Sequence, residues 1–406
     1  MVKIRRKGSI LFKINLCSLF AGMILSMNGI RYLLDIQESN FLIYGIYVIF
    51  IAFGIMKYSN KIKSSYPIST GVLFIISTVT LFYCILTSIW GGTNAIIDAI
   101  KLTISVMVAY IVSLMNSKDI RYTIDTMYVI IVIYVVIVLL KPEKIDPYII
   151  KGSNYLVLSL PIGLVLSMML IRIILHFYNK TNLVYMIPDI IVSILCFVGL
   201  TKFSGRGSIL FPFLIAILFV LFLGKKYFFK MIPIMIILIM AVVIAYRFFI
   251  KNADPYIVNR FLRMFNENSS EDRWEIWKGY IDYALSNQWF LVGGGTGSAV
   301  REYYFYPHNL YLHLAGEFGI IGIITSMCFT FCTISKEVWG FRSISIRDNK
   351  NSLIFYELCA GTIYMFLNFM KSFSLYDCCP LLIFIMALVT FTNNLKVEYS
   401  NGKLLS

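Results

Sequence analysis

The chain has 406 residues, of which 59% are hydrophobic and only 14% are charged, and its mean hydropathy is +0.79. Soluble globular proteins carry about 25% charged residues, so this composition excludes an ordinary water-soluble domain. The net charge of +15 does not indicate a nucleic-acid-binding protein, because the basic residues stand in short segments between apolar runs and not in one groove.

Apolar runs that are long enough to cross a bilayer recur along the whole chain. A helix of about 17–25 such residues crosses about 30 Å of hydrocarbon, and a backbone in lipid must satisfy its own hydrogen bonds, which favours helices. We therefore predict an all-α polytopic integral membrane protein in which residues 1–406 form a single transmembrane helical domain. The expected twelve spans are 9–27, 41–56, 70–90, 94–115, 123–140, 155–177, 183–201, 208–224, 227–250, 309–334, 352–370 and 379–395.

The placement of positive charge predicts the orientation of these spans. With the N-terminus in the cytoplasm, twenty Lys and Arg residues fall on the cytoplasmic side and seven fall in short external loops. This excess predicts that both termini are cytoplasmic. The segment 251–308 is then one long periplasmic or extracellular loop, and we expect it to carry short amphipathic helices. The seven residues in short external loops are Arg31, Lys141, Lys144, Lys151, Lys202, Arg206 and Lys371.

Several kinds of site receive no support from the sequence. Six of the eight cysteines lie inside apolar runs and the other two, Cys378 and Cys379, are adjacent, so we expect neither a structural disulfide nor a metal site. The chain has no P-loop motif and no cytoplasmic segment large enough for a nucleotide-binding domain, so ATP-driven transport by this chain alone is not expected.

The short loop 201–208 places Lys202 and Arg206 on the external side. Glycines on both sides of Arg206 allow close approach of the backbone, and Ser208 is a candidate N-cap for the next helix. An Arg at a helix N-terminus suits a lipid-linked phosphate or pyrophosphate, which a guanidinium binds bidentately. The alternative is a tight turn in which Arg206 only extends to the lipid headgroups.

Residues 271–287 of the long loop have helical periodicity. Such an amphipathic helix is expected to lie on the membrane surface, with Arg273 at the depth of the headgroups. There Arg273 either binds a lipid phosphate or merely anchors the helix. The predicted apolar face consists of Trp274, Trp277, Ile281, Ala284 and Leu285.

A glycine-rich stretch at 293–297 and a histidine-containing segment follow. The glycines lack the strand–turn–helix context of a dinucleotide site and indicate a flexible backbone that lines a polar cavity. Pro307 is well placed to begin the tenth span, which puts His308 and Asn309 in its first turn. His308 stands beside aromatic residues able to stack on sugars and is a candidate general base. The alternative is a His that only forms a hydrogen bond at the helix end.

Two further charged pairs fall within predicted spans. His313 and Glu317 are four residues apart on one helical face, which predicts a structural pair at membrane depth. Asp98 and Lys101 are three residues apart and are interpreted as a self-neutralising pair, with a proton or ion path as the alternative.

The order of these features resembles the O-antigen ligase and polymerase family, the Wzy-like and WaaL-like bacterial envelope glycosyltransferases. The resemblance rests on the short external loop with Arg206, on Arg273 and Trp277 in the long loop, on the glycine-rich stretch, and on His308-Asn309-x-x-Leu312 followed by Gly319-x-x-Gly322. The motifs cover the C-terminal half, and the expected span count and loop placement cover the whole chain.

The resemblance implies a metal-independent glycosyltransferase at the outer face of the bacterial plasma membrane, with a polyprenyl-pyrophosphate-linked glycan as donor and no cofactor. By matching position, Arg206 and Arg273 would hold the donor pyrophosphate and His308 would deprotonate or orient the acceptor hydroxyl. Lys202 would assist the two arginines, while Asn309, His313 and Glu317 would support His308. The spacing of the glycines after the two arginines is looser than the family pattern, which makes His308 the firmest of these assignments.

We therefore expect a polysaccharide polymerase that joins undecaprenyl-pyrophosphate-linked oligosaccharide repeat units into O-antigen or capsule. A ligase that moves the glycan to lipid A-core or another acceptor would share the same donor and motifs. A flippase or transporter of the lipid-linked units is the alternative of another class. The expected partners are the lipid-linked oligosaccharide, membrane lipids, and a chain-length regulator and flippase of the same pathway, with no nucleic acid.

Overall fold

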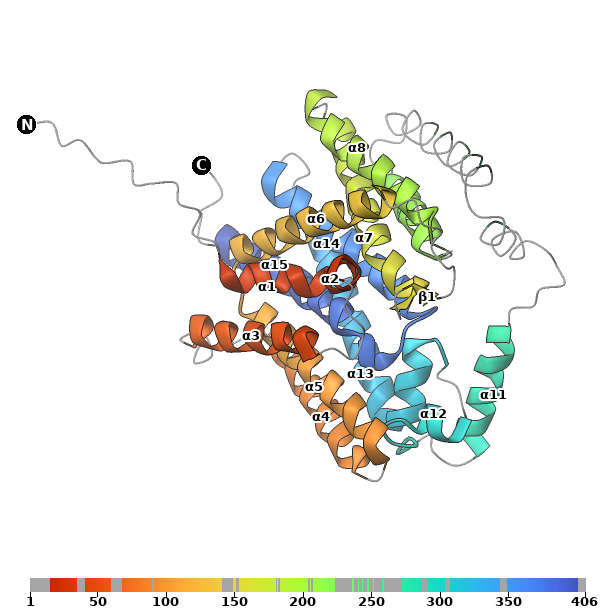
Figure 1. The fold of residues 1–406 in the computed structure, drawn as a ribbon. Coiled ribbons are helices and arrows are strands. Elements are labelled where there is room, and N and C mark those ends of the chain that lie inside the picture. The colour runs from red at the N-terminus through yellow and green to blue at the C-terminus, as the bar shows by residue number, and fades with distance from the viewer. Residues whose placement is uncertain are drawn as a thin grey trace, which may run out of the picture.

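In the computed structural model the described part of the chain is almost entirely helical (Figure 1). Its strands are two residues each, β1 (Ile149–Ile150) and β2 (Ser153–Asn154), which pair antiparallel. The structure describes residues 15–34, 41–59, 68–89, 91–140, 149–150, 153–179, 181, 183–203, 205, 207–222, 272–286, 291–303, 307–343 and 349–400, with single positions between 236 and 258.

The described helices fall into an N-terminal and a C-terminal group. The N-terminal half contains α1 (Leu16–Leu25), α2 (Met27–Leu34), α3 (Phe41–Tyr58), α4 (Ile68–Ser88), α5 (Gly92–Ser113), α6 (Ser117–Leu140), α7 (Tyr155–Tyr178) and α8 (Leu183–Leu200). A helix at Gly207–Phe222 comes next. The C-terminal part contains α11 (Asp272–Ser286), α12 (Ser298–Tyr303), α13 (Leu310–Ser343), α14 (Asn349–Phe369), the 3₁₀ turn η1 (Leu375–Asp377) and α15 (Cys379–Ser400).

The surface of the helices confirms a polytopic membrane protein. Large apolar side chains such as Ile75, Phe82 and Val129 are each at least 60% exposed on α4 and α6. Water does not tolerate such a continuous apolar surface, whereas lipid does. All eight cysteines are free thiols.

The expected count of twelve spans is not supported. Among the described residues, six helices are long and apolar enough to cross a membrane, and they correspond to the predicted spans 94–115, 123–140, 155–177, 309–334, 352–370 and 379–395. Four other predicted spans correspond to apolar helices whose described stretches have 10–17 residues: Tyr44–Tyr58 within α3, Ser77–Ser88 within α4, Val184–Leu200 within α8, and Gly207–Phe222. The predicted span 227–250 falls outside the described residues, apart from single positions.

The first predicted span, 9–27, is not a straight helix. The chain bends by 79° between α1 and α2, and only the two helices together pass as a seventh span. The bend lies at Ser26, whose backbone N–H bonds to carbonyls of α1 and whose hydroxyl donates to the Gly22 carbonyl. As a result Arg31 belongs to α2 and is only 6% exposed, instead of lying in an external loop.

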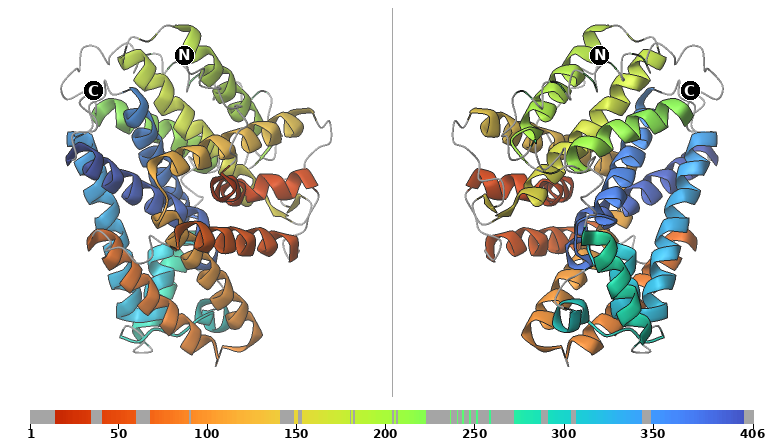
Figure 2. Two further views of the ribbon diagram at one scale, coloured as in Figure 1. Left: turned by 90° about the vertical axis from the view of Figure 1, so that its left-hand side faces the viewer. Right: turned by 90° about the vertical axis from the view of Figure 1, so that its right-hand side faces the viewer.

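The centre of the bundle consists of α7, α14 and α15. Within their apolar windows 78%, 78% and 67% of the residues are buried inside the protein, compared with 44%, 44% and 39% for α5, α6 and α13. The central helices are therefore surrounded by protein, and the outer ones keep one side for lipid. Figure 2 shows α13 running from the core toward the end of the molecule where α4, α5 and α11 also lie.

A polar cluster joins three helices near the end of the bundle that the charge pattern assigns to the cytoplasm. The carboxylate of Asp119 in α6 accepts hydrogen bonds from the Tyr58 hydroxyl at 2.5 Å and from Lys57 Nζ at 3.1 Å. Asn15, just before α1, donates to the same carboxylate. Because Asp119 is buried, these donors compensate the cost of removing its charge from water.

We expect Tyr58→Phe to lower the stability of the protein, because a hydrogen bond to a buried charged group contributes about 1.5–3 kcal/mol. Thermal unfolding of the detergent-purified protein measures the change. Tyr122→Phe is the matched control, since Tyr122 is 54% exposed on the same helix as Asp119. Equal melting temperatures for the two variants would contradict a role of the Tyr58 hydroxyl in the cluster.

Candidate active site

The candidate site is organised by a break in α13. Gly319 has φ 55° and ψ −135°, a conformation that interrupts the helix and that glycine adopts without strain. The break leaves backbone groups without helical partners. The N–H groups of Gly294 and Gly295 donate to the carbonyls of Gly316 and Glu317 at 2.8 and 2.9 Å. The glycine-rich stretch therefore caps a broken helix, and this is a more specific role than lining a cavity.

Close packing explains why glycines recur around the break. A Cβ on Gly316 would come within 1.9 Å of the Tyr280 hydroxyl, and one on Gly322 would come within 1.9 Å of the Leu314 carbonyl. The glycine-rich stretch is itself tied to α4, because the Thr296 hydroxyl donates to the Cys84 carbonyl at 2.8 Å. Segments distant in sequence thus meet at this point (Figure 1).

Glu317 and His313 form the predicted pair, and the structure adds a third partner. His313 Nε2 lies 3.1 Å from Glu317 Oε1, and the Tyr376 hydroxyl donates to Glu317 Oε2. His313 Nδ1 accepts the Leu375 N–H at 3.2 Å, which leaves the ring proton on Nε2, the nitrogen that faces the carboxylate. Both side chains are almost fully buried. These contacts fasten the segment 371–378 onto the first half of α13.

The Tyr376 phenol is suited to donate a hydrogen bond to Glu317. Burial and the neighbouring Glu317 carboxylate raise the pKa of Tyr376 well above its ordinary value, so the phenol stays protonated and acts as a donor. Its oxygen also accepts the Gly297 N–H at 3.3 Å. Tyr376 therefore joins the glycine-rich stretch to the buried pair.

The sequence predicted that His308 lies in the first turn of the helix, but in the structure His308 precedes the helix. The helix begins at Leu310, and Asn309 caps it, since its side-chain oxygen accepts the N–H groups of Tyr311 and Leu312 at 3.0 and 3.2 Å. Two backbone donors at the helix start are thereby satisfied. His308 precedes the cap with φ 51°, a left-handed conformation that is uncommon for a residue with a side chain. Its Nδ1 is 3.5 Å from the Ser372 carbonyl oxygen.

The helix predicted at 271–287 is confirmed as α11, and one residue of its predicted apolar face, Trp277, packs against the protein. Trp277 is half-buried, and its indole N–H donates to the Pro307 carbonyl at 2.7 Å, directly before His308. Trp274, Ile281 and Leu285 of the same predicted face are exposed, as expected for side chains that face lipid. One tryptophan of the predicted face therefore anchors the histidine segment. The side chain of Arg273, one turn before Trp277, lies outside the described residues.

The loop 201–208, which contains Arg206, precedes a helix that lies beside the segment 371–378. Arg206 is outside the described residues, while Lys202 is exposed. Ser208 does not cap the next helix but lies within it, and its hydroxyl lies 2.9 Å from that of Ser159. Lys371 Nζ stands 5.9 Å from the ring centroid of Phe211, one turn into this helix. Lys371 thus lies next to the helix that follows Arg206. The carbonyl of the next residue, Ser372, lies near His308.

The segment 371–378 is the part of the site that sequence analysis missed. It lies near His308 through Ser372, contacts His313 through Leu375 and contacts Glu317 through Tyr376. The sequence showed only an external cation, Lys371, and two adjacent cysteines. All of these contacts join residues that are far apart in the sequence, so no motif spacing predicts them.

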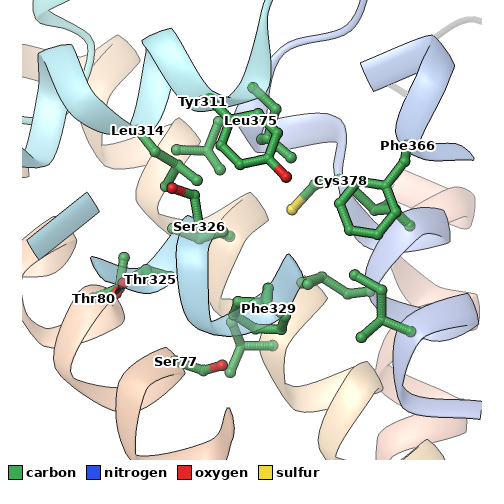
Figure 3. A pocket seen from close by; sticks show the side chains of 16 residues that line it. Ser77, Thr80, Tyr311, Leu314, Thr325, Ser326, Phe329, Phe366, Leu375 and Cys378 are labelled. Atoms are coloured by element: carbon green, nitrogen blue, oxygen red, sulfur yellow. Dashed lines mark hydrogen bonds between the residues drawn. The ribbon is translucent and has the colours of Figure 1, made fainter. Parts of the chain in front are cut away.

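An apolar cavity of about 60 Å³ lies on the far side of η1 (Figure 3). Leu375 and Cys378 line it from this segment, and Leu314 and Phe329 line it from the two halves of α13. The hydroxyls of Ser77, Thr325 and Ser326 in the lining donate to backbone carbonyls of their own helices, so the surface that the cavity offers is largely apolar. Among the described residues, no group of three or more His, Cys, Asp or Glu side chains is arranged to hold a metal ion.

Comparison with known families bears directly on this region. Residues 190–327, which include the Arg206 loop, α11, the glycine-rich stretch, His308 and the break in α13, match the family model described as O-antigen ligase. The match confirms the resemblance to the O-antigen ligase and polymerase family. A search of curated proteins finds no match to the chain. The apolar helices and the O-antigen ligase match together indicate a bacterial inner-membrane protein with a function in O-antigen assembly.

We expect Tyr376→Phe to loosen the segment 371–378, because Glu317 loses a donor that contributes about 1.5–3 kcal/mol when it bonds a buried charge. Labelling of the buried Cys378 by a thiol reagent should become faster, and the melting temperature should fall. Tyr185→Phe serves as the control, since Tyr185 is 69% exposed on α8. Unchanged Cys378 labelling would show that the phenol does not hold the segment.

Proposed function

We propose that this protein polymerises polyprenyl-pyrophosphate-linked oligosaccharide repeat units into O-antigen or capsular polysaccharide at the outer face of the plasma membrane. The observation that carries the proposal is the position of His308. It is held in a left-handed backbone conformation between the Trp277–Pro307 hydrogen bond and the Ser372 carbonyl, within the family-matched segment. A conformation of this kind is maintained only where the surroundings enforce it, often at functional sites.

The proposed reaction needs one base and one site for a charged leaving group. If His308 Nδ1–H donates to the Ser372 carbonyl, Nε2 carries the lone pair that accepts the proton of the acceptor hydroxyl. The hydroxyl oxygen then forms the new bond to the anomeric carbon of the donor sugar. The bond from that carbon to the pyrophosphate oxygen breaks, and undecaprenyl pyrophosphate leaves with the electron pair. No metal ion or cofactor takes part in this scheme.

Positive charge would stabilise the departing pyrophosphate. Arg206 and Arg273 are assigned this role with Lys202, and the position of Lys371 beside the helix that follows Arg206 makes it a fourth candidate. Asn309, His313 and Glu317 act in this proposal as positioning residues, because their contacts fix the helix start and the segment 371–378.

Transfer of the glycan to lipid A-core or another acceptor is the second candidate, favoured by the description of the matched family as O-antigen ligase. Deletion of the gene separates the two reactions. A polymerase deletion leaves single repeat units on the acceptor, whereas a ligase deletion leaves unattached polymer on the carrier lipid. We expect the first result.

We expect His308→Ala, Arg206→Ala and Arg273→Ala each to abolish the ladder of chain lengths when they complement the deletion. Loss of a positioned general base typically lowers a rate about 10²–10⁴-fold. Electrophoresis of the extracted polysaccharide, with protein levels checked by immunoblot, is the measurement. If all three variants retained normal ladders, the site assignment would be wrong. A flippase would instead be indicated if His308→Ala also stopped transport of labelled lipid-linked units.

The hydrogen bond from Trp277 to the Pro307 carbonyl, directly before His308, leads to a separate prediction. Trp277→Phe keeps an aromatic ring but removes the N–H donor to Pro307, so the chain-length ladder should shorten while the protein still accumulates in the membrane. Trp274→Phe is the matched control because Trp274 is exposed on the same helix. If both variants had the same ladder, the indole hydrogen bond would have no part in placing His308.

A further inference from the structure

A polar cavity of about 290 Å³ lies on the other side of the segment 371–378 from the apolar cavity. Phe373, Tyr376 and Asp377 line the polar cavity, while Leu375 and Cys378 line the apolar one, so the side chains of this segment divide between its two sides. The polar cavity is close to the lower limit of the roughly 300–1,000 Å³ that is usual for ligand pockets. No step of the proposed mechanism uses it.

The cavity exists because the first helix is broken. The 79° bend turns α2 away from the line of α1, and Asn28 and Arg31 of α2 then line the space. Lys101 and Ser105 line it from α5. Broken helices at membrane depth are found where they border protein or a water-filled cavity, and ionisable residues at that depth mark functional sites by default.

The basic residues that line the cavity have carboxylates nearby, which argues against a phosphate as the occupant. Lys101 Nζ is 3.7 Å from the Asp98 carboxylate, as the sequence predicted for this pair. Arg31 shares the lining with the Asp377 carboxylate. A phosphate only accepts hydrogen bonds, and two nearby carboxylates would repel it.

The lining instead suits a group that both donates and accepts hydrogen bonds. Arg31 and Lys101 are donors, Asp377 is an acceptor, and the Asn28 amide is both. Sugar hydroxyls have this mixed character. The rings of Tyr47 and Phe373 add apolar surface against which the C–H face of a sugar ring can pack.

The cavity also has a direct structural link to the candidate active site. Tyr376 lines the cavity, and its hydroxyl donates to Glu317. Phe373 lines it one residue after Ser372, whose carbonyl faces His308. A group that fills the cavity would therefore lie against the segment that positions His308.

We infer that this cavity is a saccharide-binding subsite that holds one sugar of the lipid-linked repeat unit through Asn28, Arg31 and Asp377. The inference rests on the proposed function for the identity of the saccharide. It separates recognition of the sugar from recognition of the pyrophosphate, which the proposed function assigns to Arg206, Arg273 and Lys202.

The test uses two probes with the full-length protein in nanodiscs. The first probe is the saccharide released by mild acid from the lipid-linked units that accumulate in the deletion strain. The second is undecaprenyl pyrophosphate, which carries no sugar. Binding of both is measured for the wild type, for Asn28→Ala, and for Ser105→Leu, which fills the cavity without removing a charge.

We expect each variant to weaken binding of the free saccharide at least tenfold and to leave binding of undecaprenyl pyrophosphate within twofold of the wild type. Asn94→Ala, on the exposed start of α5, is the matched control and should bind both probes normally. Unchanged saccharide binding in both variants would overturn the inference, and so would a selective loss of undecaprenyl pyrophosphate binding. Thermal unfolding confirms that the variants fold, and retained binding of the second probe is an internal control.

Failure of the proposed function would give a different result. If purified wild-type protein bound the saccharide in the cavity but did not lengthen chains when supplied with lipid-linked repeat units, the polymerase proposal would fail and the subsite would stand. If it lengthened chains and the cavity variants bound the saccharide normally, the subsite would fail and the polymerase proposal would stand.

Discussion

The architecture of the candidate site depends on one buried carboxylate. Glu317 has no exposed surface, and its charge in the interior needs donors nearby. His313 lies beside it from the same half-helix and Tyr376 donates to it from the distant segment 371–378. Because these partners come from different parts of the chain, satisfying one charge also fixes the position of two segments. The Ser372 carbonyl that faces His308 is placed by this arrangement.

The break at Gly319 is the second constraint, and it acts together with the first. An uninterrupted helix would leave the amides of the glycine-rich stretch without the carbonyls of Gly316 and Glu317. The same two residues face Tyr280 of α11 and Tyr376, so the break joins α11, the glycine-rich stretch and the segment 371–378 around one point. Backbone hydrogen bonds in a lipid environment are costly to lose, which makes this junction resistant to rearrangement.

Much of the fold was predictable from the sequence because lipid imposes simple rules on length and polarity. Six of the expected spans match helices that are long enough to cross the membrane, and the pairing of His313 with Glu317 and of Asp98 with Lys101 follows from helical spacing. The count of twelve is not supported among the described residues, and hydropathy alone does not detect a bend such as that at Ser26.

The site was predictable only in part, for a different reason. His308 and Asn309 stood out by residue type, but the sequence placed both inside the helix because Pro307 looked like its first residue. The roles of Trp277, Leu375 and Tyr376 depend on contacts between residues 30 to 62 positions apart. Helical periodicity does not encode contacts at such separations. The sequence therefore predicted the histidine but not the residues that hold it in place.

The late position of the segment 371–378 has a consequence for biogenesis. Translation and membrane insertion proceed from the N-terminus, so His308, His313 and Glu317 enter the membrane before their partners Ser372, Leu375 and Tyr376 have been synthesised. During that interval the nascent chain already contains its candidate base but lacks the segment that orients it. Assembly of the centre is therefore coupled to synthesis of the segment that follows α14, and a chain truncated after α14 is expected to be inert even when it is correctly inserted.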